Sequence, residues 1–223
     1  LGWLDRQEIE YTISDDYMHS EIKGGQRYHG FDEYITGDYS SASFFFAMAA
    51  MAGTAITVKG LDRNDAQGDK AILGILQEMG CMISWDGNAV TVRGPERLTG
   101  GTFDLNAIPD TLPILAVTAA AAEGTTKLTN VPQARIKETD RIKSMHENLS
   151  ALGVECEEEY DGIIIHGRGH VDGGCVKGFG DHRIIMAMAS LSAAAADDII
   201  IDNEEAAAVT FPSFFRLFDS IRK

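Results

Sequence analysis

Three apolar, alanine-rich segments recur along the chain, and each begins shortly after an aspartate. The aspartates are Asp38, Asp110 and Asp181, so the spacing is 72 and then 71 residues. Each segment is apolar on all faces when it is drawn as a helix, which is typical of a buried helix. An aspartate before a helix is a favourable N-cap, because its carboxylate accepts hydrogen bonds from the first free N–H groups. The pattern therefore predicts three buried helices, each with an aspartate at its start.

A common order of elements follows these segments. After each apolar segment comes a short β-like stretch and then an amphipathic helix pattern. In two cases a pair of strand patterns with an Asp-Gly turn comes next, which predicts a hairpin. The short stretches are residues 55–58, 126–129 and 199–201, the amphipathic helices are 69–79, 139–152 and 212–221, and the paired strands are 81–85 with 89–92 and 154–157 with 162–165.

This order predicts an α/β (α+β) fold of three β-α-β-α-β-β repeats related by pseudo-threefold symmetry. The repeats span about residues 23–95, 96–168 and 169–223, and the third is truncated. Buried parallel helices would lie side by side and be covered by strands and outer helices. Under that symmetry the three helix N-termini face the same way, and their positive dipole ends would together form an anion site.

Charge and composition narrow the classes of function. Acidic residues outnumber basic ones 34 to 19, a formal net charge of −15, which argues against nucleic acid and anionic membrane as partners. The longest apolar stretch, residues 44–53, is too short to span a bilayer. Cys81, Cys156 and Cys175 lie far apart without CxxC spacing, which is typical of reduced thiols in a cytoplasmic protein. Net charge does not exclude an anionic small-molecule substrate, because it does not describe a single cleft.

The densest chemical cluster is the run Arg-Ile-Lys-Glu-Thr-Asp-Arg at residues 135–141. Between residues 127 and 143 there are five basic residues and two acidic ones, so this stretch is locally positive. Lys137 and Arg141 are four residues apart and would share a helix face if the helix had already begun. The run suits either an anion-binding loop or a solvated helix start with salt bridges, and the spacing alone leaves both open.

Two further groups lie at the starts of predicted buried helices. His182 and Arg183 follow Asp181, where the helix dipole attracts anions and an arginine can bind phosphate or carboxylate through two hydrogen bonds. The alternative is a buried arginine paired with a neighbouring aspartate. Asp110 either caps its helix or, beside a cluster of cations, acts as a general base. The residues themselves do not separate these alternatives.

Five motifs carry a family resemblance that covers essentially the whole chain. They are Gly-Asp-Tyr-Ser-Ser-Ala-Ser at 37–43, Ile-Pro-Asp at 108–110, Lys-Glu-Thr-Asp-Arg at 137–141, Asp-His-Arg at 181–183 and Thr-Phe-Pro at 210–212. In order and spacing they resemble the EPSP synthase (3-phosphoshikimate 1-carboxyvinyltransferase) family of enolpyruvyl transferases. The combination of Lys-Glu-Thr-Asp-Arg with Asp-His-Arg is the most specific part of the resemblance.

The resemblance implies a two-domain enzyme of which this chain supplies a part. Members of the family have two similar-sized domains of three units each, and residues 23–223 resemble the C-terminal domain. Residues 1–22 would then be the tail of the preceding domain. The N-terminal domain of the same enzyme is therefore an expected partner, and the chain alone is expected to be inactive.

The resemblance also implies a reaction in chorismate and aromatic amino-acid biosynthesis. The family transfers the enolpyruvyl group of phosphoenolpyruvate to the 5-hydroxyl of shikimate 3-phosphate, releasing phosphate through a tetrahedral intermediate without a metal or organic cofactor. Asp110 matches the carboxylate that binds the shikimate hydroxyls and acts as base. Glu138 matches the acidic residue at the carbon that is protonated. The expected substrate-binding residues are Gln133, Lys137, Arg141, His182 and Arg183.

Two positions depart from the family's pattern. Gln133 stands where many members have an asparagine that contacts the shikimate phosphate, and Val209 stands where many have a lysine that contacts phosphoenolpyruvate. A valine cannot supply that charge, so the contact is absent or a neighbour replaces it. The alternative functions are enolpyruvyl transfer to UDP-N-acetylglucosamine and a non-catalytic anion-binding module. No metal site is expected, because His166 and His170 lie in a Gly-rich, strand-like stretch that does not place them on one face.

Overall fold

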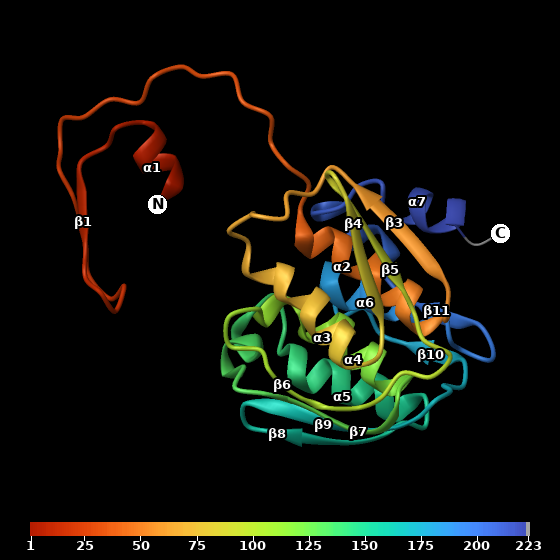
Figure 1. Cartoon of the computed structure of the whole chain (residues 1–223). Helices are drawn as coiled ribbons and strands as arrows, with labels where there is room; N and C mark the ends of the chain where they lie inside the picture. Colours follow the sequence, from red (N-terminus) through yellow and green to blue (C-terminus); the bar gives the residue numbers. More distant parts are fainter. Residues whose placement is uncertain (222–223) are drawn as a thin grey trace. The chain divides into compact units, whose positions relative to one another are not determined.

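The protein divides into two compact units after Ile35. The structure, a computed structural model, describes residues 1–221 (Figure 1). Within residues 1–221, no helix is both long enough and apolar enough to cross a membrane.

The N-terminal unit, Leu1–Ile35, holds a short helix and a hairpin. Helix α1 (Gly2–Arg6) precedes strands β1 (Tyr11–Ile13) and β2 (Ser20–Ile22), which pair antiparallel. Many of its large apolar side chains are exposed, so this unit buries little core of its own. The assignment of residues 1–22 to the tail of a preceding domain stays a prediction, and the first compact unit itself extends to Ile35.

Three helices form the centre of the second unit. Among the described residues, α2 (Tyr39–Met51), α4 (Leu112–Ala120) and α6 (His182–Leu191) are almost entirely buried and contact one another pairwise. The prediction of three buried, alanine-rich helices is therefore confirmed. Small side chains such as alanine let the helix axes approach closely, and the larger apolar side chains fill the space toward the surrounding sheets.

The middle part of the unit shows the complete predicted order of elements. Strand β6 (Thr102–Asp104) leads to α4, and β7 (Glu123–Thr129) leads to the amphipathic helix α5 (Arg141–Ala151). The hairpin of β8 (Glu155–Glu159) and β9 (Gly162–Arg168) then closes a sheet of order β6-β7-β9-β8. Strand β6 runs parallel to β7, and the other pairs are antiparallel.

The first part of the unit lacks the opening strand that the repeat predicts. It consists of α2, β3 (Ala55–Lys59), α3 (Ile72–Glu78), β4 (Met82–Asp86) and β5 (Ala89–Arg93), with sheet order β3-β5-β4. Within residues 1–221, no strand lies between β2 and α2. Residues 31–35 are exposed and have no regular secondary structure.

The last part of the unit has the order β10 (Gly174–Val176), α6, β11 (Ile199–Ile201) and α7 (Phe214–Ile221), and its assignment as a truncated repeat stays a prediction. Strand β10 pairs parallel with β11, and α6 connects them. After a 3-10 turn, η4 (Glu204–Val209), helix α7 packs on α2 through the edge-on pair of Phe44 and Phe214. A hollow of about 1030 Å³ lies between β11, η4 and α7. The pseudo-threefold symmetry of the three parts stays a prediction.

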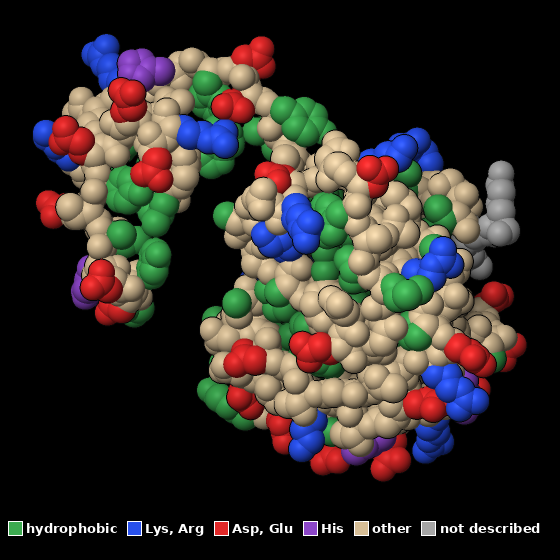
Figure 2. Space-filling model, viewed as in Figure 1, with side chains coloured by type: hydrophobic (Ala, Val, Ile, Leu, Met, Phe, Trp, Pro, Cys, Tyr) green, Lys and Arg blue, Asp and Glu red, His purple; other side chains and the backbone are tan. Residues whose placement is uncertain are grey.

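The acidic excess lies on outer surfaces. Strand β8 carries four glutamates, and all of them are exposed. Figure 2 shows acidic side chains distributed over the visible outer face of the second unit, interspersed with basic ones. The net charge therefore describes the solvated surface and does not describe the charged side chains in the interior.

Candidate functional site

The three aspartates that precede the buried helices have different roles. Asp38 caps α2 by accepting hydrogen bonds from the N–H groups of Ser40 and Ser41, and Asp181 caps α6 by accepting one from Arg183. Asp110 does not cap α4, because it lies in a 3-10 turn, η2 (Pro109–Thr111), just before that helix. The N-cap prediction is therefore confirmed at two positions and wrong at Asp110, whose carboxylate is free for other partners.

Arg141, the first residue of α5, is the centre of the site. Its side chain is 1% exposed, and Nε and Nη2 donate to the two carboxylate oxygens of Asp181 at 2.8 and 3.2 Å. Nη2 also donates to Glu138 at 2.6 Å, and Nη1 donates to Asp110 at 2.9 Å. A cation this deeply buried needs several anionic partners. Arg141 thus fixes three carboxylates from three different segments in one place.

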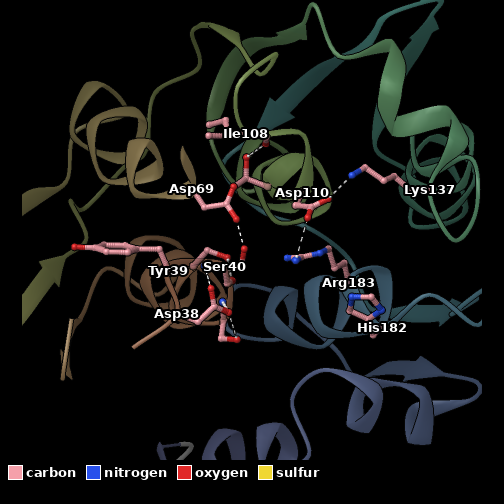
Figure 3. A network of polar contacts seen from close by, with 12 residues as sticks. Asp38, Tyr39, Ser40, Asp69, Ile108, Asp110, Lys137, His182 and Arg183 are labelled. Carbon is pink, nitrogen blue, oxygen red and sulfur yellow. Dashed lines mark hydrogen bonds and ion pairs between the residues drawn. The ribbon is translucent and has the colours of Figure 1, made fainter. Parts of the chain in front are cut away.

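Asp110 is bound by three cations, of which Figure 3 labels Lys137 and Arg183. One carboxylate oxygen lies 2.9 Å from Arg141 Nη1 and 3.2 Å from Lys137 Nζ, and the other lies 3.2 Å from Arg183 Nη2. Burial alone would raise the pKa of Asp110, but Arg183, Lys137 and Arg141 outweigh it and hold the pKa below its usual range. Asp110 is therefore ionised at neutral pH.

Glu138 and His182 lie at the opposite edge of Arg141. Glu138 is half-exposed, and its second carboxylate oxygen is 3.7 Å from Nδ1 of the buried His182. Burial lowers the pKa of His182, helped by Arg183 and Arg141, and the opposing effects of Asp181 and Glu138 do not restore it. His182 is consequently neutral at neutral pH and can exchange a proton with a neighbour.

The spacing of Lys137 and Arg141 does not reflect a shared helix face. Helix α5 begins at Arg141 and is capped by Asp140, which accepts from the N–H of Lys143, whereas Lys137 has an extended backbone. The condition for a shared helix face is therefore not met, because Asp140 caps the helix and α5 begins only at Arg141. Both cations nevertheless reach the same oxygen of Asp110.

Arg135 forms salt bridges beside the helix start, which is one of the two alternatives for this basic run. Its guanidinium bridges Asp140 and Glu158 at 2.8 Å each and donates to the carbonyl oxygen of Tyr160. These contacts tie the loop before α5 to the β8–β9 hairpin. The run 135–141 therefore contains both a structural anchor and the cations of the site.

Two predicted or noted positions lie apart from this network. The side-chain amide of Gln133 donates to the carbonyl oxygen of Asn106 at 2.9 Å, on the loop that leads to Asp110. Val209 is 78% exposed at the end of η4. Of the predicted site residues, the structure brings together Asp110, Lys137, Glu138, Arg141, His182 and Arg183.

Sequence reasoning missed two features of the site. Asp181 was expected only as a cap, yet it is also the principal partner of Arg141. Asp69, in the 3-10 turn η1 (Gly68–Ala71), accepts a hydrogen bond from the hydroxyl of Ser40 and points into the space that Asp110 and Arg183 share (Figure 3). No signal in the sequence marks Asp69. Among the described residues, no group of three or more potential ligands is arranged to hold a metal ion.

The fold and this cluster together define a class of protein. Three cations and the carboxyl groups of Asp110, Glu138 and Asp181 lie in one cluster at the starts of buried helices, an arrangement suited to an α/β domain with an anion-binding site. The chain belongs to the EPSP synthase (3-phosphoshikimate 1-carboxyvinyltransferase) family, whose model matches residues 6–218. The family resemblance seen in the motifs is thereby confirmed.

Individual relatives agree with this assignment. A 3-phosphoshikimate 1-carboxyvinyltransferase of Acetivibrio thermocellus is 45% identical over 96% of the chain, which covers 50% of that relative. One of Methanosarcina acetivorans is 45% identical over 87% of the chain and 45% of its own length. A solved EPSP synthase structure from Acinetobacter baumannii has a TM-score of 0.82 at 28% identity, over 98% of the chain and 53% of its own. The chain spans about half the length of the curated relatives it matches.

Proposed function

We propose that this chain is part of an enzyme that transfers the enolpyruvyl group of phosphoenolpyruvate to the 5-hydroxyl of shikimate 3-phosphate and releases phosphate. The observation that carries the proposal is Asp110 held among Lys137, Arg141 and Arg183, with Glu138 and His182 at the other edge of Arg141. The reaction needs cations for phosphate and carboxylate groups and two sites of proton transfer. The cluster contains both, and the names of the relatives point to the same reaction.

Asp110 takes the proton of the acceptor hydroxyl. The lowered pKa of Asp110 makes it a weak base, because Arg183, Lys137 and Arg141 together outweigh burial and stabilise the ionised form. When anionic substrate groups bind Lys137 and Arg183, they compensate those charges, and the carboxylate becomes more basic. Substrate binding thus activates the base that it needs.

Glu138 delivers a proton to the methylene carbon of phosphoenolpyruvate. Its carboxyl group is half-exposed, so a ligand can reach it, and Arg141 fixes its position at 2.6 Å. After it takes up a proton from solvent, His182, 3.7 Å away, can pass a proton to Glu138 between turnovers and return to its neutral form. The addition step is complete when Asp110 has removed the proton of the acceptor hydroxyl and Glu138 has protonated the methylene carbon.

The cations have two different tasks. Arg183 and Lys137 are partly accessible and bind the phosphate and carboxylate groups of the substrates. Arg141 is enclosed by three carboxylates, so its main contribution is to hold Asp110 and Glu138 at a fixed separation. Gln133 contributes a phosphate contact from the loop beside Asp110.

The remaining parts of the proposal concern the rest of the enzyme. The second domain supplies the opposite wall of the cleft, so the chain alone is inactive, and the chemistry uses neither metal nor organic cofactor. Nucleic acid and membrane are not partners. The location is the cytoplasm, in keeping with three cysteines that are free in the structure.

The test is phosphate release by this chain mixed with the missing domain. With phosphoenolpyruvate and shikimate 3-phosphate we expect turnover by the mixture and none by either part. Release with UDP-N-acetylglucosamine and not with shikimate 3-phosphate would replace the proposal with the related transferase. Binding of both ligands without any release would leave only an anion-binding module. Asp86→Asn removes one exposed charge at the end of β4 and serves as the control for unspecific charge effects, so phosphate release by the mixture should not change.

A further inference from the structure

Asp69 is a carboxyl group of the site that the proposed mechanism does not use. It lies in η1, and its one hydrogen-bond partner among the described residues is the hydroxyl of Ser40 at the start of α2. Its position is firmly set, because η1 packs on the loop that leads to Asp110. A Cβ added to Gly68 would lie 2.7 Å from the carbonyl oxygen of Ala107.

Charges from three other elements surround Asp69. Asp38 precedes α2, Asp110 lies in η2 and Arg183 lies on α6. Burial raises the pKa of Asp69 above its usual range, Ser40 and Arg183 oppose that rise, and Asp110 and Asp38 add to it. Within residues 1–221, no cation forms an ion pair with Asp69, so Arg183 is the nearby charge that favours its ionised form.

Binding of an anion changes this balance. Arg183 is bound to Asp110 at 3.2 Å, and Figure 3 shows the carboxyl group of Asp69, bound to Ser40, next to this network. An anionic group on Arg183 would cancel the favourable charge and add a repulsive one beside Asp69. Keeping Asp69 ionised would then place three negative groups around one guanidinium. The least costly response is uptake of a proton from solvent.

We propose that Asp69 is a proton-accepting residue of the anion site, which becomes protonated when an anionic substrate group binds Arg183. The neutral carboxyl group then donates a hydrogen bond to that anion, so Asp69 changes from repelling the ligand to binding it. The inference rests on the proposed function only in assigning an anionic substrate group to Arg183.

The experiment follows Asp69 directly in the full 223-residue chain. The ¹³C NMR signals of the aspartate carboxyl carbons are titrated in sodium sulfate and in sodium chloride of equal ionic strength. Sulfate is the probe because it stays fully ionised over the range studied. We expect Asp69 to titrate at a higher pH in sulfate than in chloride, and we expect the exposed control Asp86 to titrate identically in both.

Two variants make the inference sharper. Asp69→Asn resembles the protonated form, so at pH 8 it should bind sulfate about fivefold more tightly than the parent chain. Its sulfate affinity should fall less steeply as the pH rises than that of the parent chain. Ser40→Ala keeps the acid but removes the donor that stabilises its ionised form, so Asp69 should titrate at a still higher pH.

Identical titration of Asp69 in sulfate and chloride would overturn the inference. So would a sulfate affinity of Asp69→Asn that falls with pH as steeply as that of the parent chain. If Asp69→Asn fails to fold, the titration of the parent chain and of Ser40→Ala still decides the matter. None of these measurements involves turnover, so their failure is distinct from a failure of the proposed transferase reaction.

Discussion

The starts of α2 and α6 carry the same local motif and behave differently. Each begins with an aspartate that caps the helix through its carboxylate. Asp38 is exposed and, among the described residues, bonds only with Ser40 and Ser41 at the start of its own helix, whereas Asp181 is fully buried and also binds Arg141 through both oxygens. The difference arises from a neighbour 40 positions away and not from the motif. A cap motif therefore shows where a helix starts and does not show what else its carboxylate binds.

The two helix starts also differ in electrostatic character. At α2 the first N–H groups are satisfied by side chains, those of Ser40 and Ser41 by Asp38 and that of Tyr39 by Gln67, and Asp69 lies close by. At α6, Arg183 and His182 face the cluster around Arg141. The expected anion site with three equivalent helix ends is thus one-sided, with cations near α6 and α5 and acids near α2.

The largest expected effect separates the two capping aspartates by stability. Asp181→Ala leaves Arg141 buried without its main partner, which should lower the free energy of unfolding by about 3–5 kcal/mol. Asp38→Ala removes only a cap and should cost about 1 kcal/mol. Urea unfolding of the chain measures both values. Equal losses for the two variants would show that Asp181 is no more than a cap.

The next effect concerns Glu138 in the complete enzyme. Glu138→Gln removes the proton donor to carbon and should lower turnover by about 10²–10⁴-fold with little change in substrate affinity. Glu147→Gln is the matched control, because Glu147 is an exposed glutamate on α5 with only a 4.0 Å contact to Lys143. Steady-state phosphate release measures both. A Glu138→Gln enzyme as active as the control would remove the assigned role.

A smaller effect contrasts Asp110 with Asp69 through pH. The folded-state pKa of Asp110 is lowered, so its ionised form stabilises the fold above the unfolded-state pKa, and this stability is lost as the pH falls through the folded value. The folded-state pKa of Asp69 is raised, so the fold binds its proton more tightly, and stability falls as the pH rises through that range. Asp110→Asn should therefore reduce the loss of stability that occurs as the pH falls. Asp69→Asn should remove a loss of stability that occurs as the pH rises. Urea unfolding between pH 3 and 7 tests the signs, and slopes of the same sign would contradict them.

The smallest effect concerns the exposed Val209. Val209→Lys would restore the charge that the family pattern has at this position, and a single surface cation contributes about 0.2–1 kcal/mol. In the complete enzyme we expect the KM for phosphoenolpyruvate to fall two- to fivefold (about 0.4–1 kcal/mol) with unchanged turnover. Because screening weakens such a contact, the gain should shrink at high salt. An unchanged KM at low salt would show that a neighbour already supplies the contact.

The sequence predicted the secondary-structure elements better than the roles of individual residues. The alanine-rich helices, the strands and the two hairpins leave local patterns of spacing, and these were recovered closely at β3, β5 and α5. The missing opening strand of the first repeat was not foreseeable, because a strand forms only where a core and a partner hold it.

The sequence predicted those residues of the site that stand in recognisable motifs. Lys137, Glu138, Arg141, His182 and Arg183 stand in two compact motifs, and the structure brings both motifs to Asp110. Asp69 leaves no local trace, since its significance comes from Ser40, 29 positions earlier, and from the charge of Arg183. That Asp110 does not cap α4 is also not evident from the spacing of the aspartates, because the 3-10 turn at Pro109 displaces it from the helix start.

The most direct measurement is a single-turnover reaction of the complete enzyme carrying Asp110→Asn, with both substrates bound beforehand and with Asp38→Asn as the matched control. If Asp110 takes the hydroxyl proton, its variant should bind phosphoenolpyruvate and shikimate 3-phosphate while forming the tetrahedral intermediate at least about 100-fold more slowly. The Asp38→Asn enzyme should react at close to the parent rate. An Asp110→Asn enzyme that forms the intermediate as fast as the Asp38→Asn enzyme would contradict the central role of Asp110.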